Sequence, residues 1–265
     1  MNKLIHFLFL ATLLFGCSKN TSEKDTTEES VPLLHVSYAG EYPHDTNAFT
    51  EGLLFHQGEL FESTGATDLP QTRSLFGTID LNTGAIDVKV ELDREQYFGE
   101  GITFLNGRVY QLTYQSQKGF VYDDSTYEQI QEFSIPSEEG WGLTTDGTSI
   151  IMSDGTAQLT YLDPVSLAVT KNLIVKEEYF SKENLNELEY VNGFIYANIW
   201  MTNEIVKIDA KDGNVVGKMD LTSYATDAKS TFPNSMEMNG IAYHPERKSF
   251  FITGKLWPKI YEVRF

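Results

Sequence analysis

The sequence predicts an all-β fold, a five-bladed β-propeller closed by a strand from the N-terminal end of the chain. Between residues 33 and 265, short apolar runs alternate with Gly, Asn and Asp turns, and no long helical pattern interrupts them. Five similar units recur there with a period of about 40–50 residues, the size of one four-stranded blade. The last unit ends one strand short, which indicates that the missing strand comes from elsewhere in the chain.

Each unit opens with a hairpin that has a polar or small entry, a short apolar strand, a turn and a second strand. These hairpins start at Phe49, Phe98, Gly140, Leu185 and Met238. Four units continue into a second hairpin, over residues 75–92, 119–135, 159–175 and 205–221. A single blade cannot bury both of its faces, whereas a ring of blades can.

The final unit supports a closed ring. After its hairpin it has one more strand, "KIYEVRF" at 259–265, and then the chain ends. The segment "LLHVSYAGEY" at 33–42 precedes the first unit and has no partner there. Pairing the two completes the blade and hides a sheet edge. A β-sandwich made of several hairpins is the competing interpretation.

The first 32 residues are predicted to lie outside the fold. Residues 1–17 have a Lys near the start, an apolar run and then Cys17, typical of a lipoprotein signal peptide with Cys17 as the lipidation site. An ordinary signal peptide with an incidental cysteine is the alternative. Residues 18–32 are polar and predict a flexible tether. We therefore expect residues 33–265 to form one domain, lipid-anchored in a bacterial cell envelope, on a face that the sequence does not reveal.

Composition and spacing exclude several classes of function. The formal net charge of -18 disfavours nucleic acid as a partner, because such a surface repels phosphates. The chain has one cysteine, Cys17, so the domain relies on neither disulfides nor thiolate metal sites. The histidines show no metal-ligand spacing, and no glycine-rich phosphate loop is present.

Five motifs, in order and at propeller spacing, point to a family. They are "HDTNAFTEGL", "FGEGIT", "EGWGLTTDG", "LNELEYVNGFIYANIW" and "MNGIAYHPERKSFFITGKLWPKIYEV". Together they resemble the glutamine cyclotransferase family, the plant and bacterial type of glutaminyl-peptide cyclotransferase, over about residues 42–263. The resemblance implies a five-bladed propeller that converts the N-terminal glutamine of peptides or proteins to pyroglutamate with release of ammonia. It also implies no required cofactor and no catalytic metal, although a structural calcium ion in the channel is compatible with it. Because one chain closes the ring, we expect a monomer.

Three residues match the family's catalytic positions. Glu100 matches its acid/base glutamate, which would take a proton from the substrate amine and hand it to the departing nitrogen. Lys255 matches its active-site lysine, which would stabilise the oxyanion or hold Glu100 ionised. Asn186 matches an asparagine that would bind the substrate amide. In the absence of the resemblance, each also fits a simple turn residue.

Six further residues are expected to bind the substrate. Aromatic positions of the family pocket are matched by Phe49, Phe98, Trp141 and Trp200. Packing between blades is the competing interpretation for these rings. Glu51 stands where members of the family often carry glutamine, and Tyr114 where a tryptophan is common. Glu51 could raise the pKa of one of two neighbouring acids, pair with Lys255, or bind the substrate amine.

Two other functions remain open at this point. A non-catalytic propeller would bind peptide termini or envelope components without turning them over. A lactonase-like propeller would need inward Asp, Asn and Glu metal ligands from several blades, and usually six blades.

Overall fold

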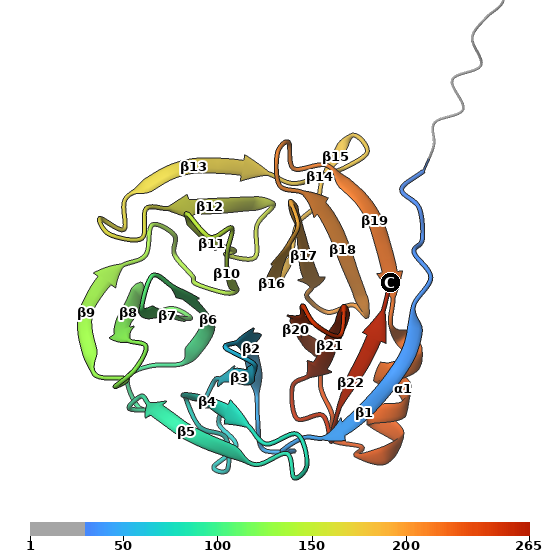
Figure 1. Ribbon diagram of the computed structural model, residues 1–265, viewed down its shortest axis with the longest axis horizontal. Helices are drawn as coiled ribbons and strands as arrows, with labels where there is room; N and C mark the ends of the chain where they lie inside the picture. The colour runs from blue at the N-terminus through green and yellow to red at the C-terminus, as the bar shows by residue number, and fades with distance from the viewer. Residues whose placement is uncertain (1–29) are drawn as a thin grey trace, which may run out of the picture.

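The computed structural model describes residues 30–265, and its fold is the predicted propeller. Five four-stranded antiparallel sheets surround a central axis, as Figure 1 shows. The predicted signal peptide 1–17, with Cys17, and most of the predicted tether 18–32 lie outside the described residues. The β-sandwich interpretation is therefore wrong.

The blades follow one another along the chain, each running from an inner to an outer strand. Blade 1 comprises β2 (Thr50–His56), β3 (Glu59–Thr64), β4 (Leu75–Ile79) and β5 (Ile86–Glu91). Blade 2 comprises β6 (Gly99–Leu105), β7 (Arg108–Thr113), β8 (Lys118–Asp123) and β9 (Gln129–Ser134). Blade 3 comprises β10 (Leu143–Thr145), β11 (Ile150–Met152), β12 (Gln158–Leu162) and β13 (Val169–Ile174). Blade 4 comprises β16 (Leu185–Val191), β17 (Phe194–Ile199), β18 (Glu204–Asp209) and β19 (Val215–Asp220).

Blade 5 contains the predicted closure. Its sequence-continuous strands are β20 (Met238–His244), β21 (Ser249–Gly254) and β22 (Lys259–Arg264). The outer strand is β1 (Ser37–Pro43), which pairs antiparallel with β22 so that the two ends of the propeller lie side by side (Figure 1). This prediction is confirmed.

Two elements were not anticipated from the sequence. The small hairpin of β14 (Lys176–Glu177) and β15 (Phe180–Ser181) lies between blades 3 and 4. Helix α1 (Thr222–Thr231) lies in the connection from blade 4 to blade 5. It buries only Ala228, so its sequence carries little apolar periodicity. Strand β22 holds the helix in place, because Lys259 Nζ and Tyr261 Oη donate to Asp227 Oδ2 of the helix over 2.9 and 2.7 Å.

The start of the described chain lies along the outer edge of blade 4. Leu33 forms a parallel bridge with Lys218 of β19, and the Lys218 amide donates to the Pro32 carbonyl over 2.9 Å. Val31 packs against the core between blades 3 and 4. The packed segment thus begins two residues before the boundary that composition suggested. No helix of residues 30–265 has the length and apolar character that a membrane-spanning segment needs.

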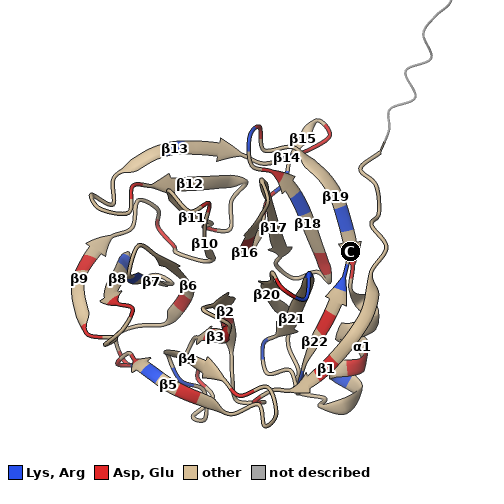
Figure 2. Cartoon of the chain, viewed as in Figure 1, with Lys and Arg blue, Asp and Glu red and all other residues tan. Residues whose placement is uncertain are grey.

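The core consists of apolar layers between neighbouring blades, where each sheet buries both faces of its inner strands. One cluster joins Ile151 and Leu159 of blade 3 to Leu188 and Ala197 of blade 4. Outer strands such as β9 are mostly exposed. Acidic residues are distributed over all five blades, including inner strands β6 and β16 (Figure 2).

Glycines let the inner strands approach closely at one end of the channel. A Cβ on Gly52 would lie 3.2 Å from Gly101 Cα, and one on Gly101 would lie 2.5 Å from the Leu143 nitrogen. A Cβ on Gly142 would lie 2.2 Å from the Asn186 oxygen. The Glu51-Gly52 and Glu100-Gly101 pairs therefore have a packing reason: the glycine lets the next blade approach, and the glutamate before it lines the pocket above.

Blade 4 carries a glutamate, Glu187, where the other blades have this glycine. Its carboxylate is buried and accepts hydrogen bonds from the Leu53 amide (3.2 Å) and the Ile241 amide (2.7 Å). The side chain thus links inner strands of blades 4, 1 and 5 across the channel. Two residues on, Glu189 accepts from the Tyr243 amide over 2.7 Å.

The Glu189 carboxyl predicts a pH-dependent stability. Burial raises its pKa from 4.5 to about 8, although the Tyr243 amide opposes the shift. The unfolded chain releases this proton near pH 4.5, so the native state loses stability as pH rises through the window from 4.5 to about 8. We expect Glu189→Gln, which keeps the acceptor oxygen, to unfold at a higher temperature than wild type above pH 8 and at a similar temperature at pH 5. Thermal unfolding followed by circular dichroism checks this. Equal melting temperatures at high pH would contradict it.

Candidate active site

A pocket of about 360 Å³ opens at the channel end where the inner strands begin. All nine residues predicted for catalysis and substrate binding line it, and they come from all five blades: Phe49, Glu51, Phe98, Glu100, Tyr114, Trp141, Asn186, Trp200 and Lys255. Two lining residues were missed from the sequence, Met236 and Glu237. They lie between α1 and β20, outside every hairpin pattern, so only their nearness to the Met238 unit could have suggested them.

Irregularities at the start of the inner strands aim the polar side chains into the pocket. The pairing register of β2 shifts between Thr50 and Gly52, that of β6 between Gly99 and Ile102, and that of β16 between Leu185 and Leu188. Glu51, Glu100 and Asn186 each lie inside one of these shifts. A β-bulge re-aims a side chain in this way.

Lys255 is paired with Glu51. Its Nζ lies 2.8 Å from Glu51 Oε1, and both side chains are buried. Glu51 Oε2 accepts from Asn239 Nδ2 over 3.0 Å. Burial raises the pKa of Glu51 to about 7, against the opposing pull of Lys255. Burial disfavours the Lys255 charge, yet Glu51 and Glu100 raise its pKa above the usual value, so the ammonium stays charged.

Glu100 lies in the same pocket as an acid without a bonded partner. It is 4% exposed, and its carboxylate has no hydrogen bond or ion pair with any of residues 30–265. Burial and then the charge of Glu51 hold its pKa well above 4.5, while Lys255 opposes both. The pocket thus contains one acid that is fixed by a cation and one that is free to exchange a proton.

Aromatic rings form the walls. Phe49 packs edge-on against Phe98 at 5.9 Å between ring centroids, and Trp141 packs edge-on against Trp200 at 5.5 Å. Lys255 Nζ lies 4.6 Å from the Phe49 ring centroid. Such walls exclude water and present electron-rich faces to a cation. Phe49 is largely buried, yet it lines the pocket and is not confined to the core.

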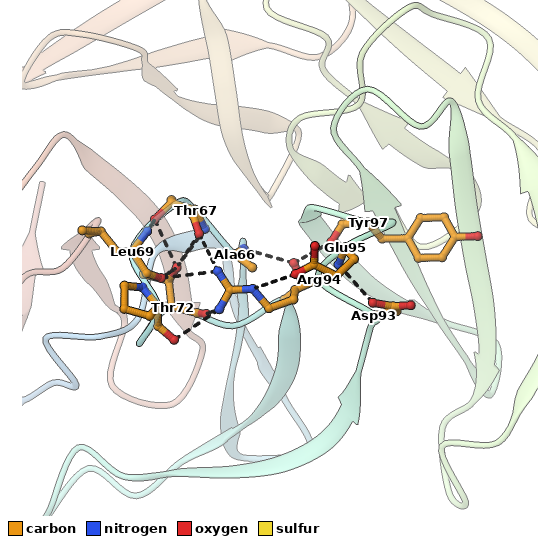
Figure 3. A network of polar contacts seen from close by, with 10 residues as sticks. Ala66, Thr67, Leu69, Thr72, Asp93, Arg94, Glu95 and Tyr97 are labelled. Carbon is orange, nitrogen blue, oxygen red and sulfur yellow. Dashed lines mark hydrogen bonds and ion pairs between the residues drawn. The ribbon is translucent and has the colours of Figure 1, made fainter.

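Phe98 is held by a polar network on its two flanks. Ser74 Oγ donates to the Tyr97 carbonyl (2.8 Å) and accepts from the Gly99 amide (3.1 Å). Arg94 ties the neighbouring loop down, donating to the Thr67 carbonyl over 2.7 Å, as Figure 3 shows. This network fixes the segment that carries Phe98 and Glu100.

The loop that carries Lys255 is held by a buried His–Glu pair. His44 Nε2 lies 3.0 Å from Glu62 Oε1, and its Nδ1 lies 2.7 Å from the Trp257 carbonyl. Burial disfavours the charge of His44, but Glu62 and that carbonyl together raise its pKa. Because His44 follows β1 and Trp257 precedes β22, the ring closure also positions the lysine.

Asn186 presents an unsatisfied group. The residue is 4% exposed, and its Oδ1 is buried with no hydrogen-bond partner among residues 30–265. Its backbone is fixed, because Ser153 Oγ donates to the Asn186 carbonyl over 2.7 Å. A buried amide without a partner is costly, so this side chain is suited to a ligand that supplies one.

The described residues show no assembled metal centre. Among residues 30–265, no group of three or more His, Cys, Asp or Glu side chains is arranged to hold a metal ion. The lactonase-like alternative is disfavoured by the count of blades, which is five. The "DLNTGAID" segment, which resembles a calcium loop, is a hairpin turn in which Asp80 Oδ1 accepts from the Asn82 amide over 2.8 Å.

Comparisons with known proteins identify the family of this chain. A glutaminyl-peptide cyclotransferase of Arabidopsis thaliana is 36% identical over 231 residues, which cover 86% of this chain and 71% of the plant protein. The crystal structure of Myxococcus xanthus glutaminyl cyclase superposes with a TM-score of 0.77 at 35% identity, covering 86% of this chain and 95% of that one. Residues 8–265 match the profile of the family described as glutamine cyclotransferase. The chain therefore belongs to the glutamine cyclotransferase family and is an enzyme of the acyltransferase class.

Proposed function

We propose that this protein converts the N-terminal glutamine of peptides or proteins to pyroglutamate, releases ammonia, and needs no metal ion for the chemical step. The observation that carries the proposal is the pairing of Glu51 with Lys255, which leaves Glu100 free within an aromatic pocket closed by Asn186. The acid, the cation and the amide are the groups that an intramolecular amide exchange requires.

In the reaction, the neutral α-amine attacks the side-chain amide carbon of the same residue. A five-membered ring forms, the carbonyl oxygen gains negative charge, and the carbon–nitrogen bond to the amide nitrogen then breaks. The attacking nitrogen loses a proton and the departing nitrogen gains one, so the proton count balances. A pocket that holds the flexible side chain folded removes much of the entropic barrier.

Glu100 is the proposed proton carrier. A peptide α-amine has a pKa of about 7.7–8.0, and the raised pKa of Glu100 moves toward that range. Groups of similar pKa exchange a proton with little free-energy difference, which suits a side chain that must act first as base and then as acid. Its lack of a bonded partner leaves both oxygens available to the substrate.

Lys255 is the proposed stabiliser of the amide oxygen, and Asn186 is proposed to bind the substrate amide through its nitrogen. The ammonium remains charged, and its ion pair with Glu51 holds it in one place before the substrate arrives. A donor that is already oriented stabilises developing charge without reorganisation. The Oδ1 atom of Asn186, which has no partner, would accept a hydrogen bond from the amide nitrogen of the substrate.

The alternative function is binding of peptide termini without turnover. The same acidic aromatic pocket would hold an ammonium group. A binding function gives no reason for a buried lysine beside a free acid, whereas the cyclisation uses both. The remaining expectations are also proposals: a lipid anchor at Cys17 in a bacterial envelope, no nucleic-acid partner, and a monomer, since one chain completes all five blades.

The direct test uses the full-length protein in mild detergent with Gln-Ala dipeptide and a chelator. We expect ammonia and pyroglutamyl-Ala in equal amounts, at a rate that the chelator does not change. N-acetyl-Gln-Ala, which has no free amine, is the matched control and should release none. Folded protein that binds Gln-Ala without releasing ammonia would favour the binding function, and loss of turnover on chelation would overturn the metal-free mechanism.

A further inference from the structure

A second cavity adjoins the catalytic pocket. It has a volume of about 560 Å³ and runs from the connection between blades 2 and 3 onto the outer strands of blade 3. The lining residues are Pro136, Ser137, Glu138, Glu139, Asp154, Thr156, Gln158, Thr160, Val169 and Asn172. We call this cavity the blade 3 groove.

Glu139 joins the groove to the pocket. Its Oε2 accepts from Trp141 Nε1 over 3.0 Å, and Trp141 lines the catalytic pocket. Its Oε1 accepts from Gln115 Nε2 over 2.8 Å, beside Tyr114 of the same pocket. A chain that leaves the pocket past these two rings therefore meets Glu139 first and then enters the groove.

The groove is acidic and contains no basic side chain. Glu138, Glu139 and Asp154 line it, and neither lysine nor arginine does. None of the ion pairs among residues 30–265 involves these three carboxylates. Their charges are uncompensated within the described part of the chain, so the field in the groove attracts cations.

The pocket itself determines which part of a peptide reaches the groove. The buried, unpartnered Oδ1 of Asn186 and the free carboxylate of Glu100 lie in the pocket that receives the glutamine. An extended chain advances about 3.3–3.6 Å per residue, so the next few residues must leave through the mouth. Gln158 Nε2 donates to Thr160 Oγ1 over 3.2 Å, which leaves the Gln158 amide oxygen and the Thr160 hydroxyl hydrogen able to bond to a peptide backbone.

We propose that the blade 3 groove binds the residues that follow the N-terminal glutamine and that Glu138, Glu139 and Asp154 favour lysine or arginine there. The inference rests on the proposed function, because it assigns the glutamine to the pocket. It identifies the substrate class as peptides and proteins that begin with glutamine followed by a basic segment.

The test compares kcat/KM for Gln-Lys-Lys-Ala, Gln-Ala-Ala-Ala and Gln-Glu-Glu-Ala, with the full-length protein. We expect the lysine peptide to exceed the glutamate peptide by about tenfold at low salt, because complementary charges raise the association rate. The preference should shrink in about 0.5 M NaCl, which screens exposed charges. The double variant Glu138→Gln, Asp154→Asn should reduce the preference by about threefold or more.

The control variant is Glu128→Gln. Glu128 is an exposed carboxyl in the turn between β8 and β9, at the opposite end of the propeller, so its loss should leave the preference at the wild-type value. Equal kcat/KM for the three peptides, or an equal fall of the preference in both variants, would overturn the groove proposal while leaving the cyclase intact.

Binding separates this proposal from the proposed function. The binding of pyroglutamyl-Lys-Lys-Ala and pyroglutamyl-Glu-Glu-Ala needs no turnover. Their occupancy is followed by the change in tryptophan fluorescence, to which Trp141 contributes through its bond to Glu139. If no peptide is cyclised, the proposed function fails, but tighter binding of the lysine peptide that the double variant abolishes still supports the groove. Equal affinities for the two peptides would overturn it.

Discussion

Glu100→Gln is expected to lower kcat/KM for Gln-Ala by about 10²–10⁴-fold, the usual contribution of a positioned acid or base. Glutamine keeps the size of the side chain but cannot carry a proton between the two nitrogens. The fold should be unaffected, because the Glu100 carboxylate bonds to no residue of the described chain. Relief of the repulsion between Glu100 and Glu51 should if anything increase the free energy of unfolding.

Ammonia release and thermal unfolding, measured on the same preparations, check this expectation. Glu189→Gln is the matched control: it removes a half-buried carboxyl of inner strand β16 that does not line the pocket, and it should retain wild-type turnover at neutral pH. A fall of less than about tenfold in a folded Glu100→Gln protein would exclude Glu100 as the proton carrier and leave the family assignment untouched.

Lys255→Met should have the second largest effect, a loss of about 10²–10³-fold in kcat, as for removal of an oxyanion donor. It should also move the acid limb of the pH profile. The groups whose charges act on Glu100 are Glu51, Lys255 and Glu139, and Tyr114 lies close by. Without the ammonium, only like charges remain around Glu100. Its pKa therefore rises further, and the rate begins to fall at a higher pH than in wild type.

Glu51→Gln should move the acid limb of the pH profile in the opposite direction. It removes the repulsion from Glu100 and releases Lys255 to act on Glu100 alone, so the acid limb should move to lower pH. Profiles of kcat/KM between about pH 5 and 9, with the same peptide, compare the three proteins. Shifts in the same direction for both variants would show that the limb belongs to the substrate amine or to another group.

The repeated hairpins and the unpaired strand at residues 33–42 were sufficient to predict the ring and its closure. Both depend on local periodicity and on the count of strands, which a sequence displays directly. The nine pocket residues were found through motifs, because each motif starts an inner strand and inner strands of a propeller meet at one channel end. Their catalytic and binding roles stay predictions.

Other features depend on distances between blades, which no single motif contains. Lys255 could have held Glu100, and the structure places its nitrogen 2.8 Å from Glu51 instead. Met236 and Glu237 were missed because they follow helix α1, which the repeating strand pattern of the sequence does not predict. Glu187 was overlooked because a glutamate within "LNELE" resembles an exposed strand residue until β16 is placed in the channel.

Blade 5 combines β1 with β20, β21 and β22, which lie at the other end of the described chain, and this arrangement affects when the active site forms during synthesis. Lys255 precedes β22, and β22 must pair with β1 before His44 can reach the Trp257 carbonyl. During synthesis, β1 therefore stays without its partner until β22 has left the ribosome. A polypeptide that lacks β22 cannot make this contact, so we expect the pocket around Lys255 to be completed only after β22 has been synthesised.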